Sequence, residues 1–573
     1  MTLFFTTSRL QPQFSLYLLC VFSLTAALQG CGGETPSTPT LFGAAETPAS
    51  CPNAQLARYK ALVYVAASGA DSDSCGDKPA SACASLAKGI ARCGVAECAV
   101  LVQHGLYPTT ATLSLRDAVS VHGSCRFGNE PERQYRTVIA AAPPGGMPAV
   151  DASGINSTTA LTGMVVLGKL ETSPGEASIA MRVSASKGLT MAGVTLVAGR
   201  GGDGASGVSV TGGPGGPGGN GGQADGLAPG GRACPSGQSA LGGNGGAGSS
   251  ASHFTFDQSS CFFECNCTAL PSAGSPDQMA GQASGQARGG GSGAAGLFGG
   301  ACSGRGSRGP APTDGTAGAA GELGACNSLG GKAVVDKSSA GRFVAGRWLA
   351  GRGGQGGAGS AGSGGGGGGA GGYSLFIRGI NDFLAYTGFP GGGGGGGGCG
   401  APESAGGQQG GASIPLVLAD AVVTGLGTGV SLVPGPGGAG GAGAGGGTGG
   451  PGGAGGEPYQ ATRISWAVGG QNVFMPGAGA PGGAGGRGGA GAGAAGGNGG
   501  PSFGIALIGN SPDPGPGVTD MIYPGMPGPP GSRGLGAANP AIANNTNSNC
   551  RSADGENGLP APTAPVMRFE EQS

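Results

Sequence analysis

Two pairs of short phrases in this chain alternate apolar and polar residues in the same layout. The first pair is ASIAMRV (177–183) followed by VTLVAG (194–199), and the second is ASIPLVL (412–418) followed by VSLVPG (430–435). Alternation with a period of two is typical of β-strands that bury one face. A unit this short cannot bury that face by itself, so the repeat predicts an all-β stack of such units, a solenoid.

Further apolar phrases predict additional strands and one short helix. The strands are expected at 62–66, near Val100 and Val119, and at 137–141, 164–167, 373–378, 383–387 and 502–508. A helix over about 82–93 would place Leu86 and Ile90 on one face. Ile179 and Ile414 take equivalent places in the two repeated units, and we expect both to face the interior of the stack.

A glycine-rich tract follows each of the two repeated units. Its unit is often Gly-Gly-X, as in 212–223 and 446–457. A period of three suits an extended helix of polyproline II type, and the bare glycine faces of neighbouring helices can exchange N–H···O=C bonds. Ordering a residue costs about 1–2 kcal/mol, whereas a net hydrogen bond contributes about 0.5–1.5 kcal/mol. The sequence therefore leaves two alternatives open, a packed sheaf of glycine helices and flexible loops.

Composition excludes several classes of protein. Of 573 residues, 137 are Gly and 41 are Pro, but the strict Gly-X-Y period of collagen is missing over most of the chain. Charged residues make up 10%, with 29 basic against 30 acidic side chains. Nucleic acid is therefore not expected as a partner, because phosphate backbones require an excess of basic charge.

The amino terminus indicates export. Residues 14–28 form an apolar run that is too short to span a bilayer comfortably and is typical of a signal peptide. The run ends Leu28-Gln29-Gly30-Cys31, which resembles the bacterial lipobox. This resemblance implies that Cys31 carries a diacylglycerol and that the chain is an outer membrane lipoprotein, bound to the cell envelope through its lipid and exposed at the surface.

The cysteines indicate an oxidising compartment. The chain has 16, and loss of Cys20 with the leader and lipidation of Cys31 leave an even number, which favours disulfides. Their pairing stays open, although the five between Cys75 and Cys125 are close enough to pair locally. The cluster at 261, 265 and 267 has a spacing that fits no usual zinc knuckle, so no metal is assigned to it.

The first strands resemble a known family. Matching residues are Tyr64, Val65, Gly69, Asp71, Pro79, Gly105 and Tyr107. They resemble the entry cap of right-handed parallel β-helices of the pectin-lyase-like class, in which a helix covers the open end of the stack. The glycine tracts resemble in composition those of PGRS-type surface proteins, which implies display at the surface.

Because the pectin-lyase-like class includes polysaccharide lyases and hydrolases, the candidate acids and bases were compared. The carboxylates Asp151, Asp336, Asp382 and Asp420 are scattered, and the histidines are His104, His122 and His253. Asp71, Asp73 and Asp77 share a loop, where calcium binding competes with the stabilisation of turns, and the second is favoured. We therefore assign no catalytic residue, no cofactor and no metal.

These observations divide the chain into a leader, a tether, a capped first set of strands, a glycine-rich insertion, further strands with glycine-rich loops, and a Pro/Gly-rich end: 1–30, 31–58, 59–199, 200–371, 372–516 and 517–573. The expected function is that of an envelope-anchored surface lipoprotein with a structural or adhesive role, whose partners are the membrane and surface polysaccharide or other cells. The alternative is a carbohydrate-binding or carbohydrate-cleaving β-helix on the same anchor. An enzyme should stack acidic or aromatic side chains on one exposed strand face, whereas a structural element should show small polar residues there.

Overall fold

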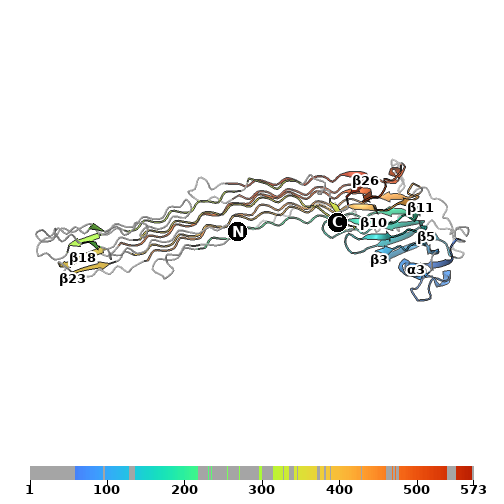
Figure 1. Cartoon of the computed structure of the whole chain (residues 1–573), viewed down its shortest axis with the longest axis horizontal. Helices are drawn as coiled ribbons and strands as arrows, with labels where there is room; N and C mark the ends of the chain where they lie inside the picture. The colour runs from blue at the N-terminus through green and yellow to red at the C-terminus, as the bar shows by residue number, and fades with distance from the viewer. Residues whose placement is uncertain are drawn as a thin grey trace, which may run out of the picture. The chain divides into compact units, whose positions relative to one another are not determined.

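The computed structural model describes residues 58–216, 314–370, 389–459 and 477–570, together with residues 230 and 234 and a few short strands between these ranges. Gaps within the ranges lie at 95–96, 128–135, 327, 334–340, 345, 428, 516 and 539–549. The described chain consists mostly of strands and extended segments, with one α-helix and two short 3-10 helices, which confirms the predicted all-β class (Figure 1).

Three parallel sheets hold most of the strands. Sheet A contains β1 (Ala61–Val65), β2 (Cys98–Gln103), β5 (Val119–Cys125), β8 (Thr159–Thr162), β11 (Leu189–Ala192) and β21 (Val423–Thr424). Sheet B contains β3 (Gly105–Thr109), β6 (Thr137–Ala141), β9 (Met164–Leu167), β12 (Thr195–Val197) and β22 (Ser431–Val433). Sheet C contains β4 (Leu113–Ser114), β7 (Pro148–Ser153), β10 (Ser178–Ser184), β20 (Ser413–Ala419), β25 (Ser502–Ile508) and β26 (Thr563–Phe569).

From β2 to β25 the chain visits these sheets in the order A, B, C, and we call one such passage a circuit. For example, β5, β6 and β7 form one circuit, and β8, β9 and β10 form the next. Each strand pairs in parallel with the strand of the same sheet in the neighbouring circuit. The repeated units of the sequence are such neighbours, because Ile179 lies directly opposite Ile414 in the pairing of β10 with β20.

The three sheets enclose one continuous apolar core. Inward-facing residues from successive circuits, such as Ile139, Val166, Leu196 and Leu432 in sheet B, are at most 2% exposed. Such burial removes about 25 cal/mol of unfavourable hydration per Å² of apolar surface, so these rows of side chains provide the main stabilisation of the stack.

Ile179 and Ile414 do not belong to this core, which corrects the expectation that they face the interior. Both are buried in a second apolar cluster with Phe343 and Trp348. These two aromatic residues come from a hairpin of β16 (Arg342–Val344) and β17 (Arg347–Leu349), which lies within the long glycine-rich insertion. The hairpin covers an apolar patch of sheet C that would otherwise be exposed to water.

The amino-terminal end of the stack is capped. Helix α3 (Leu86–Arg92) buries Leu86 and Ile90, as expected from the sequence. It begins later than predicted, because Ser85 is its N-cap and accepts a hydrogen bond from the backbone N–H of Lys88, while a 3-10 helix, η2 (Pro79–Ser81), occupies the preceding residues. Cys83 bridges to Val65 of β1 and so covers the edge of the first strand.

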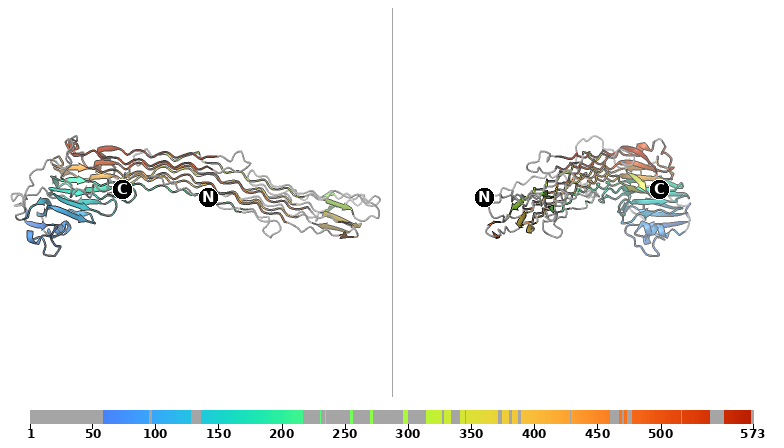
Figure 2. Two further views of the ribbon diagram at one scale, coloured as in Figure 1. Left: turned by 180° about the vertical axis from the view of Figure 1, so that it is seen from behind. Right: turned by 60° about the vertical axis from the view of Figure 1, so that its left-hand side comes forward.

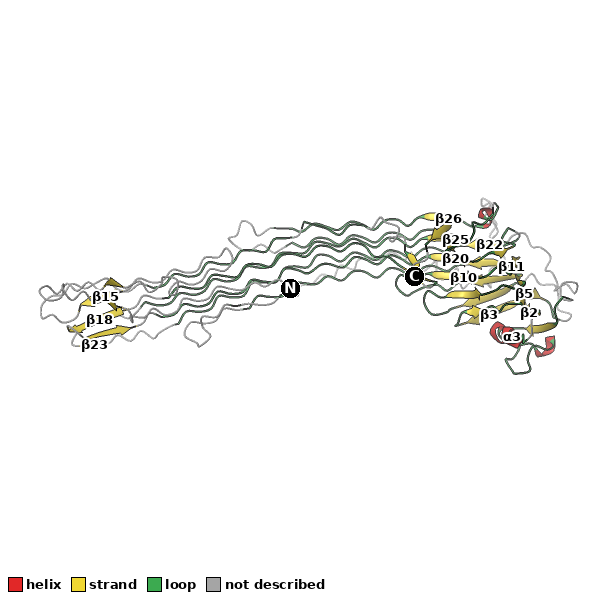
Figure 3. Cartoon of the chain, viewed as in Figure 1, coloured by secondary structure: helices red, strands yellow, loops and turns green. Residues whose placement is uncertain are grey.

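The glycine-rich tracts are inserted in connections that run from sheet B to sheet C. Short loops link sheet B to sheet C in the first circuits. In the later circuits the same connection is made by long insertions, at 198–412, 434–501 and 524–562. Eight segments of these insertions are described, numbered here as tracts 1 to 8: 199–216, 314–333, 351–370, 389–411, 434–459, 477–501, 524–538 and 550–562. They run side by side in the views of Figure 2 and are drawn as loops in Figure 3.

Short strands lie between the tracts, at the end away from the three sheets (Figure 1). They are β15 (Gly296–Gly299), β18 (Ser374–Gly379) and β19 (Asp382–Tyr386), which share a sheet, and the pair β23 (Ala467–Val468) with β24 (Gln471–Asn472). A further pair, β13 (Phe254–Thr255) with β14 (Leu270–Pro271), lies between tracts 1 and 2 in the sequence. The strands predicted at 373–378 and 383–387 are therefore confirmed within one residue.

The last strand, β26, was not singled out in the sequence. It lies in the Pro/Gly-rich segment after residue 517 and carries Pro565, which has no N–H to donate. Proline is tolerated at the edge of a sheet, and β26 has a partner in sheet C on one side, β25.

Candidate functional site

The glycine tracts are joined by backbone hydrogen bonds that recur every third residue. In tract 4 the N–H groups of Gly392, Gly395 and Gly398 donate to carbonyl oxygens of tract 6, with N···O distances of 3.0, 2.9 and 2.8 Å. The acceptors are Ala480, Gly483 and Gly486. The spacing is three residues in both tracts, so the same position of every triplet faces the same neighbouring tract.

A second set of donors in each tract points to a different neighbour. Gly396 and Cys399 of tract 4 donate to Gly216 and Gly213 of tract 1, which runs in the opposite direction. Tract 5 in turn donates to tract 4, from Gly453 to Gly396 at 2.7 Å and from Gly456 to Gly393 at 2.7 Å. The tracts therefore form a cross-linked bundle in which each member bonds to several others.

Glycine is required wherever one backbone lies against another. A Cβ added at Gly453 would overlap the carbonyl of Gly216, and one added at Gly395 would overlap the carbonyl of Gly453. The adjacent Ala454, at the third place of its triplet, is exposed. Glycine is therefore needed at these close contacts, whereas Ala454 has room for a side chain.

The number of glycines per triplet follows the position of the tract in the bundle. In tract 4, the eight successive glycines 391–398 are all buried. In tract 7, only Gly528, Gly531 and Gly534 are buried between 526 and 535, and the two residues between successive glycines are exposed. The buried part of tract 4 thus reads Gly-Gly-Gly, whereas the more exposed tract 7 reads Gly-X-Y.

The two sequence alternatives can now be compared for the tract at 212–223. Gly212 donates to Thr448 at 2.9 Å and Gly215 donates to Pro451 at 2.8 Å, so the described part of this tract is packed. Residues 217–223 lie outside the described residues.

Two disulfides cross-link the bundle, and two others tie the cap. Cys234 pairs with Cys399 and Cys326 pairs with Cys550, across 165 and 224 residues of chain. Cys75 pairs with Cys83 and Cys93 with Cys98, which confirms the expected local pairing in the cap. Cys125 is disulfide-bonded as well. Closing such long loops reduces the entropy of the unfolded chain and so favours the ordered bundle.

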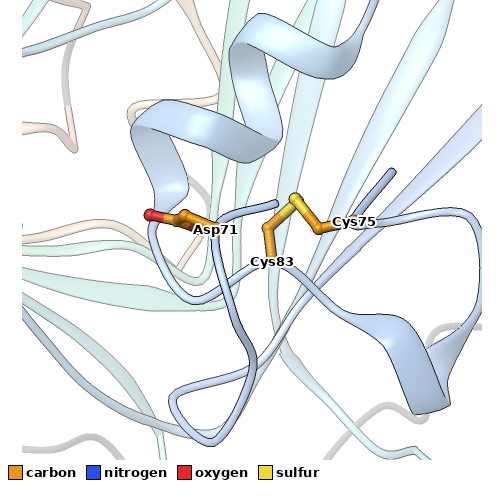
Figure 4. Close-up of side chains that lie close together, drawn as sticks. All are labelled: Asp71, Cys75 and Cys83. Atoms are coloured by element: carbon orange, nitrogen blue, oxygen red, sulfur yellow. A yellow bond between two sulfur atoms is a disulfide. The ribbon is translucent and has the colours of Figure 1, made fainter. Parts of the chain in front are cut away.

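The acidic loop near the cap positions helix α3. Asp71 Oδ1 accepts hydrogen bonds from the backbone N–H groups of Ala84 and Ser85, at 2.8 and 3.0 Å. Burial of this carboxyl raises its pKa, but the hydrogen bonds from Ser85 and Ala84 outweigh that effect and hold the pKa below its usual value. Asp71 also lies near Cys75 and Cys83, as Figure 4 shows, but those sulfur atoms are bonded to each other and so supply no thiolate for a metal.

The other two acids of this loop form ion pairs with the same helix. Asp73 pairs with Lys88 at 3.0 Å and Asp77 pairs with Arg92 at 3.1 Å. The hydrogen bond and charge of Lys88 lower the pKa of Asp73. The three carboxylates therefore have separate partners, as expected for a loop that stabilises a turn.

The scattered carboxylates are not brought together either. Asp151 of β7 pairs with Arg182 of β10 at 2.7 Å, and both side chains are less than 20% exposed. Asp420 follows β20 and accepts a hydrogen bond from the N–H of Asn510 at 2.8 Å, where it stabilises a turn. Asp336 and the side chain of Asp382 lie outside the described part of the chain. The two described carboxylates thus have structural partners.

His122 lies in a small aromatic cluster on the outer side of sheet A. Its Nε2 is 2.9 Å from the Tyr59 hydroxyl and its Nδ1 is 2.8 Å from Thr162 Oγ1. The side chain is 7% exposed, and burial, aided by the charge of Arg58, lowers its pKa to about 4. Both ring nitrogens of this buried histidine therefore have hydrogen-bond partners within the sheet and its cover. His253 lies outside the described residues.

The pKa of His122 predicts a loss of stability in acid. Because the folded state holds the imidazole neutral, the unfolded chain binds a proton first as the pH falls from 6.5 towards 4. At 1.36 kcal/mol per pKa unit, the folded state should lose at most roughly 3 kcal/mol over this window. Urea unfolding at several pH values measures this loss. His122→Gln should reduce the slope of stability against pH, and an unchanged slope in this variant would contradict the assignment.

Three positions on the outer side of sheet A carry small hydroxyl residues, beside apolar ones such as Ala99 and Leu62. Thr190 of β11 and Thr424 of β21 lie opposite each other, with their hydroxyl oxygens 2.8 Å apart. Ser120 Oγ accepts a hydrogen bond from the backbone of Ala160 on the neighbouring strand. Small hydroxyl residues of this kind are the pattern expected of a structural element.

Several features were missed at the sequence level. The hairpin that carries Phe343 and Trp348 has an aromatic residue on each side of a turn, and Gly346 has a φ of 74° there. Alternation in the phrase RFVAGRWL is the signal that indicates this hairpin. The difference in glycine content between tracts 4 and 7 is also visible in the sequence, but only the packing of the tracts explains it.

Cys31, the apolar leader and the cysteines at 261, 265 and 267 lie outside the described residues. No helix in the described part of the chain is long and apolar enough to cross a membrane. Comparisons of the whole chain with models of known protein families, with curated proteins and with solved structures found no match.

Proposed function

We propose that this chain is an exported bacterial lipoprotein that displays a glycine bundle on a parallel β-helix, with a structural or adhesive role at the cell surface. The observation that carries the role is the hydrogen-bond pattern of the tracts, which repeats every three residues and joins each tract to several neighbours. Backbone hydrogen bonds between neighbouring tracts favour a rigid scaffold, which suits a structural or adhesive role.

The β-helix proposal rests on the order of the strands. Successive circuits place their strands in sheets A, B and C in turn, and the pairing in each sheet is parallel. A right-handed path agrees with the strong preference for right-handed crossovers between parallel strands. We further propose that the tracts adopt the polyglycine II conformation, since three residues per turn account for the spacing of their hydrogen bonds.

The lipid anchor rests on the lipobox-like residues Leu28 to Cys31, and it is tested by labelling. Cells expressing the protein are fed an alkyne fatty acid, and incorporation is measured in the parent, in Cys31→Ser and in Cys20→Ser. We expect label in the parent and in Cys20→Ser, and loss of label with release from the membrane in Cys31→Ser. A parent that carries no label would refute the lipoprotein proposal.

Carbohydrate cleavage is disfavoured by the described carboxylates. Glycoside hydrolysis requires two carboxyl groups that flank one bond, but Asp151 and Asp420 each have other partners. The structural or adhesive role therefore explains the described residues better.

A further inference from the structure

Cys125, the last residue of β5, is buried and disulfide-bonded. The other described cysteines are joined to one another, in the pairs 75–83, 93–98, 234–399 and 326–550. The partner of Cys125 must therefore be one of the cysteines outside the described residues. With Cys20 of the leader set aside, these are Cys31, Cys51, Cys261, Cys265, Cys267 and Cys302.

The described chain begins beside Cys125. Tyr59 packs in one apolar cluster with Cys125 on the outer side of sheet A. The hydroxyl of Tyr59 is 2.9 Å from Nε2 of His122 and accepts a hydrogen bond from Arg58, so the chain is fixed at this point. Cys51 precedes Tyr59 by eight residues, which can extend over at most about 29 Å. Cys51 can therefore reach Cys125.

The cysteines between tracts 1 and 2 start from a remote point. Tract 1 spans 199–216, and at the rise of about 3.1 Å per residue expected of a polyproline II helix it takes the chain roughly 55 Å from the sheets. Cys302 follows β15 by three residues, and β15 lies at the far end of the bundle (Figure 1). Because effective concentration falls as a linker lengthens, the short linker to Tyr59 favours Cys51, also over Cys31, which is 28 residues away.

We propose that Cys51 is joined to Cys125, and that this disulfide transmits tension from the tether to the interior of sheet A. β1 follows the tether directly and stands at the end of sheet A, where β2 is its one described strand partner. β5 has strand partners on both sides, β2 and β8. Tension that entered through β1 would strip an edge strand from the sheet, whereas tension that enters at Cys125 acts on a strand held on two sides. The role under tension rests on the proposed lipid anchor, but the pairing does not.

Peptide mapping without reduction tests the pairing. Trypsin and a glutamate-specific protease should release 47–58 (TPASCPNAQLAR) and 117–126 (DAVSVHGSCR) from the full chain, and each contains a single cysteine. We expect mass spectrometry to find these two peptides joined in the parent and in the control Cys302→Ser, and to find them separate after reduction. A link from Cys125 to a cysteine of 261–302 would overturn the pairing and leave the lipid anchor untouched, whereas a link to Cys31 would overturn both.

Single-molecule pulling tests the role under tension, with handles on residue 32 and on the last residue of the chain. In the double variant Cys51→Ser/Cys125→Ser we expect the first rupture at a lower force than in the parent, with added extension from residues that precede β5. The control is Cys75→Ser/Cys83→Ser, which removes a disulfide inside the loop that Cys51 and Cys125 close. That loop bears no tension while the closing disulfide is intact, so the control should keep the first rupture force of the parent. Equal first rupture forces in the parent and in Cys51→Ser/Cys125→Ser would overturn this role even where mapping finds the pairing.

Discussion

Gly453→Val should open the glycine bundle locally. The added side chain would overlap the carbonyl of Gly216, so tract 5 must move away from its neighbours and lose its hydrogen bonds to tract 4. Overpacking of this kind costs about 1–3 kcal/mol, and each lost hydrogen bond adds about 0.5–1.5 kcal/mol. Amide hydrogen exchange should therefore accelerate at Gly450, Gly453 and Gly456, which donate to Cys399, Gly396 and Gly393.

The matched control is Ala454→Val, one residue further along the same tract. Ala454 is exposed, so the larger side chain extends into solvent and the exchange of the neighbouring amides should be unchanged. Limited proteolysis should show the same contrast. Equal exchange rates in the parent and in both variants would mean that the tracts are not packed in solution.

Ile414→Asp should strongly destabilise the junction of sheet C with the aromatic hairpin. Ile414 is 0% exposed and packs with Ile179, Phe343 and Trp348, where a carboxylate finds no partner. Burial of an unpaired charge costs several kcal/mol, against a total stability of about 5–15 kcal/mol for a typical domain. We expect a loss of about 4 kcal/mol in urea unfolding.

Leu106→Asp provides the control for this prediction. Leu106 is also an apolar residue of a strand, β3, but it is 58% exposed. Surface substitutions usually change stability by less than about 0.5 kcal/mol. If Ile414→Asp unfolded at the same urea concentration as Leu106→Asp, the second apolar cluster would make no contribution to stability.

Much of the strand structure follows from local pattern. The strands predicted at 137–141 and 164–167 have those bounds in the structure, because these short runs are mainly apolar and end near glycine, proline or a charged residue. The facing of Ile414 could not be predicted in this way. Ile414 is covered by Phe343 and Trp348, which come from a hairpin remote in sequence. The residues on both faces of its own strand are apolar, so alternation does not indicate which face Ile414 lies on.

Whether a tract is packed depends on the neighbouring tracts, which cannot be inferred from the sequence of that tract alone. A Gly-Gly-X triplet is equally compatible with a flexible loop, and the balance is decided by the tracts beside it and by disulfides such as Cys326–Cys550. Their pairing could not be derived either, because it joins residues 224 positions apart. Strand β26 was missed for a related reason, since its partner β25, rather than its own composition, defines it.

The three-residue spacing of the tract hydrogen bonds also restricts how these tracts can change in length. In a tract with one buried glycine per triplet, such as tract 7, insertion or deletion of one or two residues would turn every later glycine away from its neighbour and point a side chain into the bundle. Removal of a whole triplet would leave all later residues facing the same way and shift the tract by one repeat against neighbours that repeat at the same interval. Viable length variants of these tracts should therefore differ by multiples of three residues, although their sequences carry no strict triplet composition.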